Sequence, residues 1–166
     1  AARNVAKDGN TEYATLDEAV AAAKDGDTIT LLASTSIDKN LIIQKDITLN
    51  LAGQTLLANA NIQAEKQLNI TDTNGGKIIL QQDKTQKGNN SVSVISKGSD
   101  AKITLEKGSV LVVGSFDTGY AFYARDGGTI IVNGGTVEAQ DAALTGNNTT
   151  GDMTFEVNGG PLTAKR

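Results

Sequence analysis

The 166-residue chain contains no cysteine and no histidine. Without cysteine it can form neither a disulfide nor a thiolate metal site. Without histidine it lacks the commonest metal ligand and the usual general base at neutral pH. We therefore expect neither a metal nor a cofactor.

Aromatic residues are also scarce, and neither sign of charge is in large excess. Aromatics make up 4% of the chain, there is one proline, and the net charge is −4. So few rings favour a narrow aliphatic core over a ring-lined pocket, and the turns are left to Gly, Asn and Asp. No basic run is present, so we expect no nucleic-acid partner. No apolar run approaches the roughly 20 residues of a membrane span, so we expect no membrane insertion.

Residues 121–166 contain two copies of one unit. Each copy has a short apolar strand, an Asn-Gly-Gly corner and a second strand, and the corners begin at Asn133 and Asn158, 25 residues apart. A strand-only repeat of about 20–30 residues is typical of a solenoid, in which each unit buries its apolar face on its neighbour. We therefore expect one domain over residues 1–166.

Residues 15–25 are predicted to form a short helix that caps this domain. Thr15 and Glu18 have the spacing of a capping box, and Gly26 is suited to ending the helix. Its apolar face consists of Leu16, Ala19, Val20 and Ala23. Residues 1–14 are predicted to be an irregular lead-in with a turn at residues 8–10.

Short apolar runs follow the helix, and coils of strands are predicted over residues 28–166. The first runs cover residues 28–32, 41–44, 47–51, 55–58, 68–71 and 77–80. Residues 81–91 contain no apolar side chain and are predicted to be a solvated loop projecting from the stack. Beyond it, residues 103–110, 130–137 and 155–162 align with one another.

Glycines recur at the predicted corners, at Gly53, Gly76, Gly108, Gly135 and Gly160. We expect these positions to require a positive φ or a close approach between coils.

The segment GDTITL at residues 26–31, directly after the capped helix, resembles the entry to a right-handed parallel β-helix of the pectin-lyase-like kind. The segments ITLNLAGQTL (47–56) and GGTIIVNGGTV (127–137) resemble the repetitive β-helix domains of large bacterial surface proteins. The resemblance covers about residues 11–166. It implies an all-β solenoid of three short parallel sheets, a helix over the open end of the core, and a secreted or cell-surface bacterial location.

The two ends of such a solenoid differ. The predicted helix covers one end, and nothing comparable follows Leu162. An open last coil offers unpaired backbone groups and bare core. We therefore expect the chain to be part of a longer protein or assembly, or to self-associate through its uncapped C-terminal coil.

Three aspartates are candidates for chemistry. β-Helix enzymes that cut acidic polysaccharides use clustered Asp residues, or Ca²⁺-binding carboxylates with an Arg or Lys base. Asp100 and Asp152 occupy equal positions relative to the aligned strands, and Asp126 lies near the same line. The competing and preferred interpretation places all three in turns, where Asp bonds to its own backbone.

Four of the six aromatic residues lie within residues 116–123. Tyr120, Tyr123, Arg125 and Asp126 are the candidate ligand-binding residues, because exposed rings beside a cation can stack on a sugar. Side chains alternate along a strand, so Phe122 and Tyr123 cannot both be buried. The simpler interpretation is that Phe122 fills the core and Tyr123 only covers a coil.

These observations predict a non-catalytic structural or adhesive domain that presents its loops to a glycan, a host surface protein or a sister subunit. Two alternatives stay open. A polysaccharide-active lyase or hydrolase would have three acids close together, and a phage fibre or tailspike segment would have a long apolar outer face.

Overall fold

The computed structural model describes residues 3–82, 92–114, 119–147 and 151–165. Within these ranges one helix, α1 (Leu16–Ala22), accompanies three sheets. Sheet A contains, in spatial order, β18 (Thr154–Val157), β15 (Thr129–Val132), β12 (Lys102–Leu105), β9 (Gln67–Thr71), β6 (Ile47–Asn50), β3 (Asp27–Leu31), β1 (Ala6–Asp8) and β2 (Thr11–Tyr13). Sheet B contains β19 (Leu162–Ala164), β16 (Thr136–Ala139), β13 (Ser109–Val113), β10 (Lys77–Gln81), β7 (Thr55–Ala58) and β4 (Thr35–Ile37). Sheet C contains β17 (Ala142–Asn147), β14 (Tyr120–Arg125), β11 (Val94–Lys97), β8 (Ile62–Ala64) and β5 (Leu41–Ile43).

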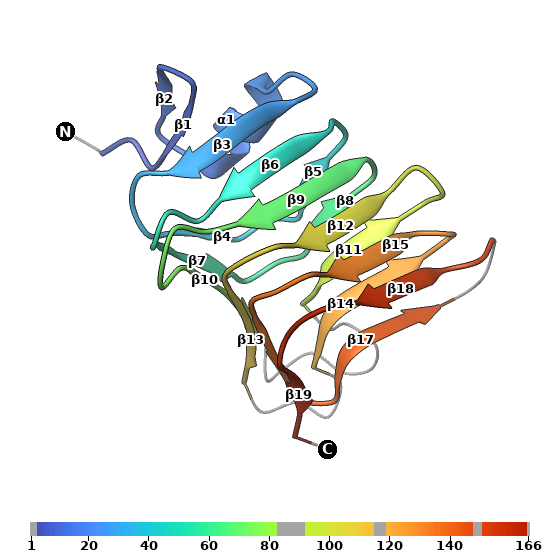
Figure 1. Ribbon diagram of the computed structural model, residues 1–166. Coiled ribbons are helices and arrows are strands. Elements are labelled where there is room, and N and C mark those ends of the chain that lie inside the picture. Colours follow the sequence, from blue (N-terminus) through green and yellow to red (C-terminus); the bar gives the residue numbers. More distant parts are fainter. Residues whose placement is uncertain (1–2, 83–91, 115–118, 148–150, 166) are drawn as a thin grey trace.

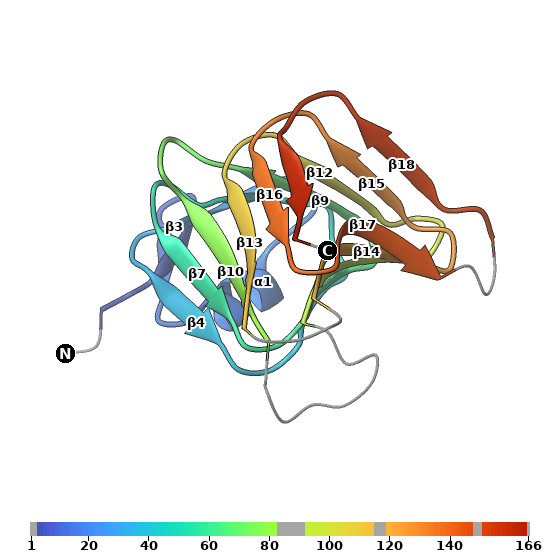
Figure 2. The same cartoon turned by 90° about the horizontal axis from the view of Figure 1, so that it is seen from below.

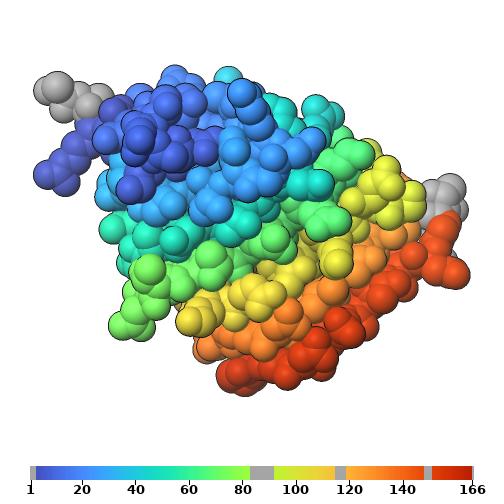
Figure 3. Space-filling model, turned by 45° about the horizontal axis from the view of Figure 1, so that its top comes forward, coloured from blue at the N-terminus to red at the C-terminus, as the bar shows by residue number. Residues whose placement is uncertain are grey.

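From β3 onward each sheet takes every third strand, and all these pairs are parallel. The chain therefore visits sheets A, B and C in turn and adds one strand to each on every circuit. Figure 1 shows the resulting succession of strands, and Figure 2 shows β4, β7, β10, β13 and β16 side by side in sheet B. In Figure 3 the colours run across the surface in sequence order. This all-β arrangement with one helix is compatible with a β-solenoid.

Residues 1–14 were predicted to be irregular, and for the described residues this is wrong. The predicted turn at residues 8–10 is present, but it joins β1 and β2 in an antiparallel hairpin. Strand β1 also pairs antiparallel with β3, so it covers the first edge of sheet A. The hairpin escaped prediction because Thr-Glu-Tyr and Ala-Lys-Asp carry almost no apolar alternation.

Helix α1 has the predicted start and apolar face but ends early. Thr15 Oγ1 accepts the amide of Glu18 at 3.1 Å, and the four predicted apolar residues are buried. The helix stops at Ala22 rather than at residue 25. Lys45, from the next circuit of the chain, donates to the carbonyl oxygens of Ala21 (3.0 Å) and Ala23. Cations stabilise helix C-termini, and here the cation is distant in sequence.

One aliphatic core runs through the molecule. Ile29 of sheet A, Leu56 of sheet B and Ile62 of sheet C belong to one buried cluster, and α1 covers its first end. The predicted alignment of the later coils is confirmed, because Ile103, Ile130 and Phe155 are register partners.

The glycine corners fall into two kinds. Gly108 and Gly135 are in the same corner position of successive coils with positive φ, 105° and 79°. In the earlier coils the positive φ lies one residue sooner, at Gly53 (79°) and Gly75 (78°). Gly76 is instead required by close approach, since an added Cβ would lie 2.3 Å from Asp72 Oδ1.

The predicted solvated loop at residues 81–91 lies mostly outside the described residues, and its predicted start is wrong, because Gln81 ends β10 and Gln82 is buried. The buried side chain of Gln82 donates to Val92 O and accepts from Val92 N, both at 2.9 Å. This amide reproduces the two bonds that a neighbouring strand would make, so it joins the two ends of the insertion.

Two glycines separate the effect of close packing from that of backbone conformation. A Cβ at Gly135 would lie 2.3 Å from the carbonyl oxygen of Gly108, whereas a Cβ at Gly9 (φ 59°) meets nothing within 4 Å. We expect Gly135→Ala to lower the free energy of unfolding by more than about 2 kcal/mol and Gly9→Ala by about 1 kcal/mol, the ordinary cost of a left-handed residue. Urea unfolding measures both, and equal losses would contradict the close contact between coils.

Two buried serines, one in β11 and one just before it, differ in their partners. Ser96 is 0% exposed, its Oγ has no hydrogen-bond partner in the described part of the chain, and alanines (Ala64, Ala124) are its register partners. Ser93 Oγ donates to Tyr120 O at 2.7 Å. We expect Ser96→Ala to stabilise the protein by about 1 kcal/mol and Ser93→Ala to destabilise it by a similar amount. Thermal unfolding distinguishes them; a loss of stability in Ser96→Ala would show that its hydroxyl is bonded.

Candidate functional site

The outer face of sheet C carries two columns of side chains that cross the strands, and two of the candidate residues, Tyr123 and Arg125, stand in them. Parallel register places Ile42, Gln63, Ile95, Tyr123 and Thr145 in one column. The next outward position on each strand gives a second column of Gln44, Glu65, Lys97, Arg125 and Asn147. Neighbouring rungs of a sheet are about 4.8 Å apart. Ile95 is only 7% exposed, so the first column is buried at its middle rung and at least partly exposed at the other four.

Tyr120 and Tyr123 lie against each other on this face. Their ring centroids are 6.0 Å apart with an interplanar angle of 37°, and both side chains are partly exposed. Regular alternation would place residues three apart on opposite faces. Here Ala121 and Phe122 are both fully buried, so the alternation shifts by one residue between them. Phe122 lies in the core and Tyr123 at the surface, as the alternation argument requires.

Arg125 and Asp126 follow at the corner that leaves β14. Arg125 Nε lies 3.6 Å from Asp126 Oδ2, and the two side chains are 47% and 25% exposed. Asp126 is in a left-handed conformation with φ 54°. The ion pair leaves about half of the Arg125 side chain open to solvent, where its guanidinium can still donate to a ligand.

The three aspartates considered for catalysis lie at turns or in loop segments. Asp100 is exposed and forms an ion pair with Lys66 at 3.6 Å, and Asp152 is exposed in the segment before β18. Across the described ranges, no three carboxylates converge in a way that could hold a metal ion. Asp100 and Asp126 lie in turns as the preferred interpretation predicts, whereas Asp152 lies in an irregular segment.

A polar network that the sequence did not reveal lies on the same face of sheet C, on β8 and at the end of β5, and β11 separates it from the strand of the tyrosines. Glu65 accepts from Gln44 Nε2 and from Gln63 Nε2, both at 3.0 Å. The Gln44 amide, with smaller contributions from Gln63 and from the Lys97 charge, lowers the pKa of Glu65. Gln44 and Glu65 are 21 residues apart, so only the register between coils could have predicted this contact.

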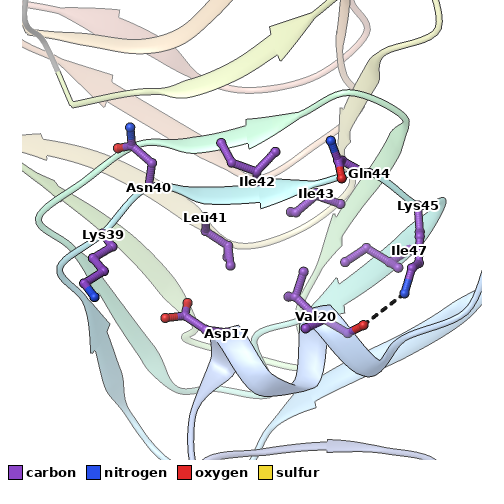
Figure 4. A pocket seen from close by; sticks show the side chains of 11 residues that line it. Asp17, Val20, Lys39, Asn40, Leu41, Ile42, Ile43, Gln44, Lys45 and Ile47 are labelled. Atoms are coloured by element: carbon purple, nitrogen blue, oxygen red, sulfur yellow. Dashed lines mark hydrogen bonds between the residues drawn. The ribbon is translucent and has the colours of Figure 1, made fainter.

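A groove opens at the first edge of the same sheet, between β5 and α1. It encloses about 440 Å³. Its lining consists of Asp17, Val20, Ala21, Lys39, Asn40, Leu41, Ile42, Ile43, Gln44, Lys45 and Ile47. Figure 4 shows Val20 on the helix facing Leu41, Ile43 and Ile47, with Lys45 bonded to the end of the helix. The interior of the groove is aliphatic and its rims are polar.

Comparisons with known proteins found no match, so the functional assignment rests on the geometry of the site. No protein-family model, no curated protein and no solved structure matches the chain. Among the described residues no helix has the length and apolar character needed to cross a bilayer.

The Glu65 network predicts a pH-dependent contribution to stability. Because the folded-state pKa of Glu65 is lowered, its contribution is fully present above the ordinary value of 4.5 and is lost as pH falls through the folded-state pKa. We expect Glu65→Gln to be less stable than the wild type at pH 7, by no more than about 1 kcal/mol for so exposed a group, and nearly equal to it at about pH 3. Thermal unfolding at both pH values measures this; an undiminished difference at low pH would mean that the carboxylate charge is not responsible.

Proposed function

We propose that the chain is a right-handed parallel β-helix of the pectin-lyase-like kind that serves as a non-catalytic structural and adhesive module of a secreted or cell-surface bacterial protein. The return of the chain to the same parallel sheet after two other strands supports this fold, because crossovers between parallel strands are right-handed in about 98% of cases. The stack provides a stiff body, and its outer faces and loops provide the surface for recognition.

The observation that carries the binding proposal is the Tyr120–Tyr123 pair beside Arg125. Tyrosines expose a flat apolar face together with a polar hydroxyl, which suits them to ligands that are apolar on one side and hydroxylated at the edge. A sugar ring is such a ligand. The cation of Arg125, at the next outward position of the same strand, would supply hydrogen bonds to its hydroxyl groups, and a longer oligosaccharide crossing β11 would reach the Glu65 network. A glycan is therefore the ligand we assign to this face, and a host surface protein is the other partner considered.

The placement of the carboxylates supports a binding role over a catalytic one. Glycoside hydrolysis uses two carboxyl groups facing each other across the bond that is cleaved. Asp100 is instead paired with Lys66, and Asp126 with Arg125. A polysaccharide-active lyase or hydrolase stays the alternative.

A fibre or tailspike segment is favoured by one observation on sheet B. Its outer face has an apolar column of three partly exposed side chains, Leu57, Ile79 and Leu111. The column ends at Ser36 on one side and Glu138 on the other, so it is short for a trimer interface. A stable trimer by light scattering would favour this alternative.

Self-association through the last coil is also part of the proposal. Phe155 and Val157 of β18 are 39% and 53% exposed, although their register partners Ile130 and Val132 are buried. Exposed apolar side chains on unpaired strand edges favour the addition of further strands.

The glycan proposal is tested by screening the wild-type chain against an array of neutral and acidic oligosaccharides and titrating any ligand that binds. We expect Tyr123→Ala and Tyr120→Ala to weaken binding at least tenfold, about 1.4 kcal/mol, because they remove the stacking surface. Tyr123→Phe is the matched control and should keep most of the affinity. Absence of binding to every glycan, or an alanine variant that binds as well as the wild type, would refute the assignment.

A further inference from the structure

The dipeptide Asn-Gly occurs at Asn74, Asn133 and Asn158, each time followed by a second glycine and preceded by a β-branched residue. Asn-Gly is prone to deamidation, because glycine lets the backbone turn until its amide nitrogen reaches the side-chain carbonyl carbon of the asparagine. All three asparagines are exposed, so access of water does not distinguish them. The three copies are chemically matched, and a difference in their reactivity has to come from the fold.

Hydrogen bonds hold the asparagine side chains at two of these corners. Asn133 Nδ2 donates to Glu106 Oε1 at 2.9 Å, and Asn158 Nδ2 donates to Asn133 Oδ1 at 2.8 Å. These side chains form a ladder across three successive coils, and turning either asparagine toward its own backbone breaks a bond. In the described part of the chain, the Asn74 side chain makes no hydrogen bond.

The glycine after each asparagine differs in the same way. The amides of Gly134 and Gly159 each donate to a carbonyl oxygen of the previous coil at 3.3 Å. Both glycines also pack on that coil, since an added Cβ would lie 2.6 Å from a carbonyl oxygen at Gly134 and 2.4 Å from one at Gly159. The Gly75 amide has no hydrogen-bond partner within the described ranges, and an added Cβ there would meet nothing within 4 Å. The peptide group before Gly75 can therefore rotate without displacing a neighbouring coil.

We propose that Asn74 is a site of spontaneous deamidation and that the fold protects Asn133 and Asn158 from the same reaction. The amide nitrogen of Gly75 attacks the side-chain carbonyl carbon of Asn74, and the side-chain nitrogen leaves as ammonia, taking the proton of the attacking amide. Water then opens the resulting succinimide ring at either carbonyl and leaves aspartate, joined to Gly75 through its α- or its β-carboxyl group. Water is the only co-reactant and ammonia the only other product.

The reaction alters a corner that joins two coils. Asp72 is buried, and its oxygens accept the amides of Gly53 at 2.8 Å and Gly76 at 2.7 Å. The second of these bonds spans residue 74, in the connection from β9 to β10 (Figure 1). A β-linked aspartate lengthens the main chain inside this span, and either product places a new negative charge close to the Asp72 carboxylate. The modified corner is therefore less stable than the original.

The test follows each asparagine in the full chain during incubation at mildly alkaline pH. Tandem mass spectrometry after proteolysis locates the mass increase that accompanies exchange of the amide for an acid. We expect Asn74 to convert at least about tenfold faster than Asn133 or Asn158, because two hydrogen bonds must break first at each of the other corners. In urea, which removes the fold, the three rates should become similar. Equal rates in the folded chain, or the same preference for Asn74 in urea, would overturn the inference.

Two substitutions of Glu106 form a matched pair that tests the protection. Glu106→Ala removes the acceptor of the Asn133 side chain and should accelerate deamidation of Asn133 by about threefold or more, without changing the rate at Asn74. Glu106→Gln retains an acceptor oxygen and should leave Asn133 slow. An Asn133 rate that is the same in both variants would show that the ladder is not protective.

The consequence for the fold is measured by thermal unfolding of aged protein. Wild-type chain that has converted at Asn74 should unfold at a lower temperature than fresh chain. Asn74→Gln, incubated in parallel, should keep its unfolding temperature, because the longer side chain closes the corresponding ring far more slowly. Converted wild type that unfolds like fresh protein, or an equal loss in Asn74→Gln, would refute the effect assigned to this corner.

Discussion

The stack depends on side-chain oxygens at the corners that accept an amide of the following coil. Asp46 Oδ1 accepts from the Gln67 amide at 2.9 Å and Asn40 Oδ1 from the Asn61 amide at 3.0 Å, each across 21 residues. Strands of three to six residues leave much of the backbone in corners, where sheet pairing cannot satisfy it. These short polar side chains do so, and they hold successive coils to one length and one register.

Where the number of residues per coil changes, a different hydrogen-bonding arrangement joins the corners. Asp72 is buried and its two oxygens accept the amides of Gly53 (2.8 Å) and Gly76 (2.7 Å), joining two corners. In the last coils Asn158 donates to Asn133 across 25 residues. On sheet C, parallel pairing places Tyr123 between Ile95 and Thr145.

The later coils and the cap could be predicted because their signals are local. The repeated Asn-Gly-Gly corners at Asn133 and Asn158 and the apolar face of α1 are visible within short windows of sequence. β4 and β8, three residues each, were missed because Thr-Ser-Ile and Ile-Gln-Ala are too short to show a period. Of the candidate site, the gathering of tyrosines was predictable, but the Glu65 network and the groove were not. Both arise between residues that only the stacking of coils brings together.

The bond between the Gln82 side chain and the backbone of Val92 has a consequence for how such a protein can diversify. Because these bonds join the two ends of the insertion, the pairing of the flanking strands does not depend on which residues lie between Gln82 and Val92. A lineage that exchanges the intervening residues keeps the two hydrogen bonds that join Gln82 to Val92. For protein engineering, a foreign epitope or binding peptide can be inserted between Gln82 and Val92, two residues that are already hydrogen-bonded to each other.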